Sequence, residues 1–85
     1  MLSYHDIANA FAADAATAAP VDAVLAANHV TLEDLSKADY PLAALLGTAG
    51  VAHANVQWAV KAEQRNIWRE RLQDVLDDIK AYLTK

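Results

Sequence analysis

Residues 68–83, WRERLQDVLDDIKAYL, carry the apolar pattern that decides the fold. Large apolar side chains recur there at alternating spacings of four and three residues, at Trp68, Leu72, Val75, Ile79 and Tyr82. This spacing places them on one face of an α-helix and is typical of a coiled-coil seam. Leu83 lies beside the same face, and we call these six residues the seam. The seam predicts a C-terminal helix that packs on a second copy or a partner helix, with Trp68 as its main contact.

The helix around the seam is predicted to be long, because neither proline nor glycine occurs after residue 50. A continuous helix over residues 51–84 would measure roughly 50 Å. The apolar residues of its first half, Val56, Val60 and Ile67, fall on nearly the opposite side from the seam. The two halves therefore need different neighbours, or the helix breaks near Asn66.

Four short helices are predicted over residues 1–50. Capping residues and prolines mark their starts, at Ser3, Pro20, Thr31 and Pro41. The first three helices should end near Thr17, near Asn28 and just before Tyr40. Gly47 and Gly50 indicate a turn or a close helix contact. We expect residues 51–65 to close the core of these helices and residues 66–84 to be available to a partner.

The composition fits a single small all-α domain. A chain of 85 residues forms one domain at most, and two glycines and two prolines are too few for a β-sandwich or barrel. The absence of cysteine excludes disulfides and cysteine zinc sites. Residues 40–60 carry no charge, but polar groups such as His53 and Gln57 interrupt them, so we expect no membrane span. The first residues lack the basic stretch of a secretion signal, which predicts a cytoplasmic protein or a component of a particle.

Charge is distributed unevenly along the chain. The net charge is −4, yet residues 1–40 hold six acids and one base, whereas residues 61–85 hold six bases and five acids. An acidic chain argues against a general nucleic-acid-binding protein. Four bases form a basic cluster on the long helix, at Lys61, Arg65, Arg69 and Arg71. Two alternatives remain for this cluster: the acidic helices of the same chain neutralise it, or an acidic partner or nucleic acid binds it.

The sequence offers little material for catalysis or metal binding. The histidines His5, His29 and His53 have no second histidine or glutamate at metal-ligand spacing. No serine or threonine lies in a glycine-flanked elbow, and no glycine-rich phosphate loop occurs. We therefore expect no enzyme activity, no cofactor and no metal site.

These features predict a non-catalytic assembly or adaptor protein that acts by helix–helix association, with a homo-oligomer as the expected form. Its size, alanine content and helical pattern are typical of small accessory or structural proteins of bacteria and phages. The alternative is an acidic inhibitory protein that occupies a basic nucleic-acid-binding site on its partner. The acids that would make that contact are Asp22, Glu33, Asp34 and Asp39.

Overall fold

A computed structural model describes residues 2–11 and 19–84 of the chain, and they form five helices with no strand among them. The helices are α1 (Tyr4–Ala10), α2 (Pro20–Ala27), α3 (Leu32–Ala38), α4 (Tyr40–Trp58) and α5 (Ala62–Leu83). The predicted small all-α bundle, with four helices ahead of a long C-terminal one, is confirmed.

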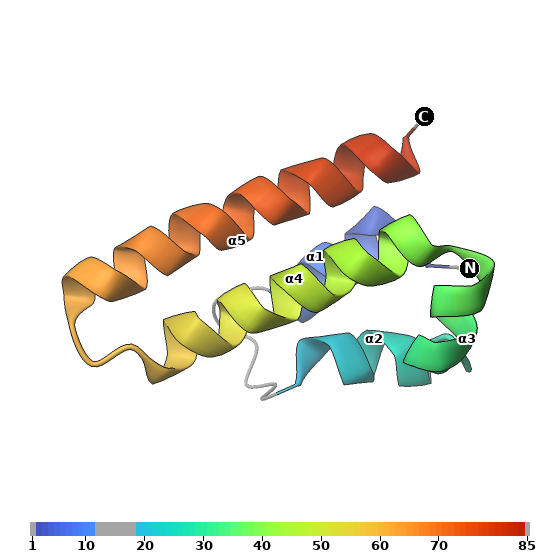
Figure 1. The fold of residues 1–85 in the computed structure, drawn as a ribbon, viewed down its shortest axis with the longest axis horizontal. Coiled ribbons are helices and arrows are strands. Elements are labelled where there is room, and N and C mark those ends of the chain that lie inside the picture. The colour runs from blue at the N-terminus through green and yellow to red at the C-terminus, as the bar shows by residue number, and fades with distance from the viewer. Residues whose placement is uncertain (1, 12–18, 85) are drawn as a thin grey trace.

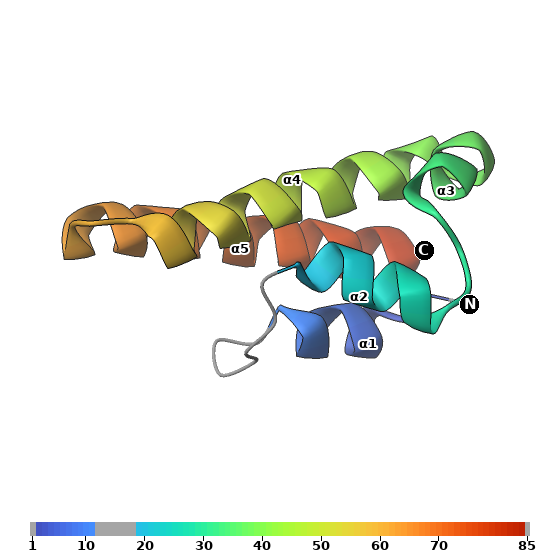
Figure 2. The same ribbon diagram turned by 90° about the horizontal axis from the view of Figure 1, so that it is seen from below.

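An antiparallel hairpin of α4 and α5 forms the long axis of the molecule, whose dimensions are 38 × 24 × 20 Å (Figure 1). The helices α1 and α2 lie side by side on one face of this hairpin, and α3 crosses the end where α4 begins (Figure 2). In both views the end of the hairpin that joins α4 to α5 projects beyond α1 and α2. The two ends of the long axis are therefore built from different elements.

The helix starts follow the local capping predicted from the sequence. The Ser3 hydroxyl accepts a hydrogen bond from the backbone N–H of Asp6 at 3.2 Å, and the Thr31 hydroxyl accepts one from the N–H of Asp34 at 3.0 Å. Each bond satisfies a donor that the first helical turn leaves free. Within the described residues α1 ends at Ala10, and the remainder of the helix predicted to reach Thr17 lies outside them.

The predicted prolines and the predicted stop of α2 are also in place. Pro20 occupies the first turn of α2, and a proline occupies the first turn of α4. Asn28 caps the C-terminus of α2, and His29 follows with a φ of 56°. That left-handed conformation directs the chain out of the helix and into the short connection to α3.

The two glycines do not form a turn, because α4 runs through both positions, and only Gly50 makes a close helix contact. A Cβ added at Gly50 would lie 3.1 Å from Cγ2 of Val21, whereas one added at Gly47 would meet nothing within 4 Å. The absence of a side chain at Gly50 thus allows α2 to pack closely on α4.

The helix predicted over residues 51–84 is interrupted, which corrects the sequence prediction. Ala59 and Lys61 have extended backbone, with ψ angles of 128° and 139°, and they separate α4 from α5. Asn66 lies inside α5, so the break comes several residues before the position considered from the sequence. Folding α5 back along α4 buries the seam, whereas Val60 and Ile67, on the other apolar face of the predicted helix, stay exposed.

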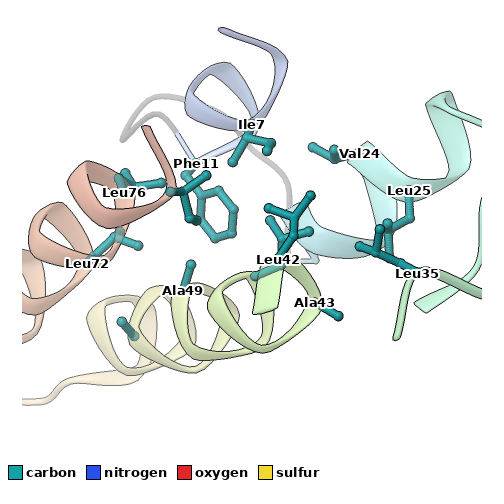
Figure 3. Close-up of a cluster of buried hydrophobic side chains, with 13 residues drawn as sticks. Ile7, Phe11, Val24, Leu25, Leu35, Leu42, Ala43, Ala49, Leu72 and Leu76 are labelled. Atoms are coloured by element: carbon teal, nitrogen blue, oxygen red, sulfur yellow. The ribbon is translucent and has the colours of Figure 1, made fainter. Parts of the chain in front are cut away.

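The core is contributed by all five helices. Ile7 of α1, Leu46 of α4 and Ile79 of α5 are its most fully buried large side chains. Figure 3 shows Phe11, which follows α1, with its ring between Ile7 and the leucines Leu72 and Leu76 of α5. The residues that close α1 therefore fill the space between the two long helices.

Alanine substitution at the two glycines should separate helix propensity from packing. Gly47→Ala should raise the free energy of unfolding by about 1 kcal/mol, because alanine favours the helix and the added methyl group meets no neighbour. Gly50→Ala raises the helix propensity equally, but its methyl group crowds Val21. The free energy of unfolding should therefore rise less than in Gly47→Ala, or fall. Urea denaturation followed by circular dichroism measures both. Equal gains would show that α2 does not press on α4 at Gly50.

Candidate functional site

The seam faces the interior of the same chain. Leu72 and Ile79 are buried, and Trp68, Val75, Tyr82 and Leu83 are partly buried against the same core. The helix α5 packs along α4 over this face and also contacts α1. The sequence predicts that residues 66–84 are available to a partner; in the structure α4 and α1 pack against the seam, four of whose six residues keep some exposure.

One seam residue also makes a specific polar contact with a distant part of the chain. The Tyr82 hydroxyl donates a hydrogen bond of 2.5 Å to Oδ1 of Asp39. The same carboxylate oxygen caps α4 by accepting from the backbone N–H of Leu42 at 3.4 Å. The hydrogen bond to Asp39 raises the pKa of Tyr82 above its ordinary value of 10.0, and burial acts in the same direction. The hydrogen bond of Tyr82 thus connects the C-terminal end of α5 to the junction of α3 and α4.

The basic cluster is not one uniform surface. The Arg65 guanidinium donates a hydrogen bond of 3.1 Å to the carbonyl of Ala59, in the connection between α4 and α5. Arg71 lies over the Trp68 ring, with its Cζ atom 4.9 Å from the ring centroid. Lys61 is the N-cap residue of α5 and is exposed, as is Arg69.

Among residues 2–11 and 19–40, no acid forms an ion pair with this cluster. The salt bridge found in the described chain joins Lys37 to Glu33 within α3, at 3.3 Å. Asp39 is engaged with Tyr82. Of the four acids considered for an inhibitory surface, Asp22 and Asp34 are exposed with no side-chain partner among residues 2–11 and 19–84.

The most exposed apolar side chains lie where α4 joins α5. The exposed fractions are 81% for Trp58 and 92% for Val60, the two highest among the large apolar residues described, and Ile67, further along α5, is 46% exposed. We call these three residues, together with the bases Lys61 and Arg65, the tip. The tip belongs to the part of the hairpin that projects beyond α1 and α2 (Figures 1 and 2). The sequence placed Val60 and Ile67 opposite the seam, but it did not indicate the exposure of Trp58, because the break was considered near Asn66 and not directly after Trp58.

A second exposed apolar pair lies at the other end of the long axis. Leu32, at the start of α3, and Tyr40, at the start of α4, are both exposed. Figure 1 shows α3 and the start of α4 at the end opposite the tip. Each end of the molecule therefore presents apolar side chains to solvent.

The three histidines have separate surroundings. His5 lies within hydrogen-bonding distance of the Asn9 side chain at 3.1 Å, His29 is in the turn after α2, and His53 is buried in α4. Among the described residues, no group of three histidine, cysteine or acidic side chains is placed to hold a metal ion. Within that same part of the chain, none of the helices combines the length and apolarity needed to cross a bilayer.

Comparisons with known protein families, curated proteins and solved structures find no match for this chain. Its function is therefore argued from its own residues.

Replacing Leu72 by aspartate should unfold the domain instead of merely exposing the seam. A buried unpaired carboxylate costs several kcal/mol, which is comparable to the total stability of about 5 kcal/mol expected of a small domain. Ile67→Asp, at an exposed position of the same helix, should leave the helical circular dichroism intact. A folded Leu72→Asp variant would contradict the burial of the seam within the chain.

The Tyr82 hydrogen bond predicts a loss of stability at high pH. A raised pKa means that the folded state favours the protonated phenol. The resulting gain in the free energy of unfolding is complete below the ordinary pKa of tyrosine and is lost as the pH rises through the pKa of the folded state. The wild-type protein should therefore lose more unfolding free energy above pH 10.0 than Tyr82→Phe does. Urea denaturation of both proteins over a pH series tests this, and parallel curves would show that the hydrogen bond has no effect.

Proposed function

We propose that this chain is a non-catalytic assembly protein that associates with copies of itself end to end, the tip of one copy contacting the α3 end of the next. The observation that carries the proposal is the exposure of Trp58 and Val60, which no other described part of the chain covers. Single exposed apolar residues are ordinary, but a tryptophan and a valine almost fully exposed at one projecting end form a contact surface. Tryptophan also contributes more than most residues to the affinity of protein interfaces.

The charges at the two ends favour a head-to-tail arrangement. Residues 61–71 carry four bases and two acids, a net charge of +2, whereas residues 32–40 carry three acids and one base, a net charge of −2. Contact between two identical ends would bring like charges together, while contact between unlike ends is attractive. The exposed Leu32 and Tyr40 give the acidic end an apolar surface for Trp58 and Val60.

The shape of the molecule sets the strength of this association. A cross-section of 24 × 20 Å limits an end-on contact to about 500 Å² per partner, which is at the low end of specific interfaces. We therefore expect weak association that depends on protein concentration. A head-to-tail contact is heterologous, so it builds rings or open filaments and not closed two-fold dimers. A protein that forms rings or filaments fits the accessory or structural role that the sequence predicts. That role would be in the cytoplasm or in a bacterial or phage particle.

The alternative, an acidic inhibitory protein, has less support. Two of its four acids already have partners within the chain, because Glu33 pairs with Lys37 and Asp39 bonds to Tyr82. The remaining Asp22 and Asp34 lie in the first turns of two different helices, where they interact favourably with the positive helix ends.

The proposal is tested by sedimentation and light scattering across a wide concentration range. The average mass of the wild-type protein should rise with concentration and fall with added salt. Trp58→Ser should weaken association roughly thirty-fold, the loss typical of an interface tryptophan. The matched control is Val51→Ser, which removes a side chain that is 59% exposed in the middle of α4 and should change nothing.

A charge exchange tests the arrangement of the ends. Lys61→Glu should weaken association through repulsion from the acidic end, and adding Asp34→Lys to the same chain should restore it. A monomer at every concentration would overturn the proposal. Association that Lys61→Glu weakens and Asp34→Lys fails to restore would overturn the head-to-tail arrangement.

A further inference from the structure

A pocket of about 420 Å³ lies between α1, α4 and α5. Its apolar walls are formed by Phe11, Val56 and Leu72. Phe11 and Leu72 are seen in Figure 3, where the Phe11 ring faces α5. This volume falls within the range of small-molecule sites, which are mostly apolar and carry a few polar groups. The residues with polar groups that line this pocket are Tyr4, His53, Gln57, Arg69 and Gln73.

The first polar group is His53, which lines the pocket from α4. It is only 6% exposed, and its Nδ1 atom is buried without a hydrogen-bond partner among the described residues. The ring meets the Phe11 ring edge-on, with 5.6 Å between centroids. Burial lowers the pKa of His53 below its ordinary 6.5, so the imidazole is neutral near pH 7 and offers one donor and one acceptor. A buried polar side chain normally has a partner, so this imidazole is suited to a ligand.

The second polar group is Arg69, which lines the pocket from α5 and is itself exposed. Within the described chain its guanidinium has neither a hydrogen bond nor an ion pair. Its neighbours in the basic cluster differ, because Arg65 holds the α4–α5 connection and Arg71 lies on Trp68. A free guanidinium beside an apolar pocket is the group best suited to bind a carboxylate, through two parallel hydrogen bonds.

We propose that this pocket binds a small aromatic carboxylic acid that bears a hydroxyl group at the end remote from its carboxylate. The carboxylate binds Arg69, the aromatic ring packs against Phe11 and Leu72, and the hydroxyl group exchanges a hydrogen bond with the His53 imidazole. This site is separate from the tip and does not depend on end-to-end association.

Isothermal titration calorimetry with para-hydroxyphenylpropionate as the probe tests the proposal on the full chain. Saturable binding of one probe molecule per chain is expected. Arg69→Gln should weaken binding at least tenfold, since the charged hydrogen bonds to the carboxylate are lost. The matched control is Arg71→Gln, which removes a base two residues away that does not line the pocket and should leave binding unchanged. No saturable binding, or equal binding to wild type and Arg69→Gln, would overturn the proposal.

Two altered probes assign the contacts on the wild-type protein, and two variants check each assignment. The amide of the probe should bind wild type at least tenfold more weakly than the acid does, and this difference should vanish in Arg69→Gln. Phenylpropionate, which lacks the hydroxyl group, should also bind more weakly, and His53→Leu should remove that preference. Equal binding of phenylpropionate and the hydroxylated probe to wild type would overturn the role given to His53.

Discussion

The rest of the structure depends on the reversal of the chain between α4 and α5, where the Arg65 guanidinium donates a hydrogen bond to the Ala59 carbonyl. This hydrogen bond satisfies a backbone acceptor where the helix is interrupted, in a connection without glycine or proline. An unbroken helix of roughly 50 Å would exceed the 38 Å length of the molecule. It would also leave the apolar faces of both halves without a common neighbour. The reversal between Trp58 and Ala62 brings the seam of α5 onto the core and leaves Trp58 and Val60 outside it.

Small side chains on α4 decide how this core is filled. The buried positions of α4 include Ala43, Ala49 and Ala52, which lets other elements approach its backbone closely. Larger side chains from α1 and α5, such as Ile7 and Ile79, then fill the space beside these alanines. The described part of α1 has seven residues. The pocket at His53 is lined by Tyr4 and Ala8 of this helix and by Phe11 at its end.

Local features of the sequence predicted local structure well, and tertiary features could not be read from it. The bonds of Ser3 and Thr31 join residues three positions apart, so the caps are encoded within one turn. The spacing of Leu72 and Ile79 correctly indicated a buried helical face but not its neighbour, because a heptad pattern is the same for a second copy and for α4. The interruption at Ala59 is stabilised by Arg65 six residues later, a contact with no sequence signature. The isolation of His53 depends on packing alone, so no spacing rule identifies it.

Competition between contacts within the chain and contacts between chains explains why the seam and the tip have different neighbours. A connection of three residues, Ala59 to Lys61, holds α4 beside α5 at an effective concentration in the millimolar range or above, which a free second copy in dilute solution does not reach. Any seam on α5 is therefore filled by α4 before a partner arrives. The hairpin cannot cover the residues of its own connection, because these must leave the core to reverse the chain. Trp58 and Val60 remain exposed for that reason. Apolar residues at the connection of a helical hairpin are consequently a better indication of a contact with another molecule than the heptad spacing of apolar residues along its helices.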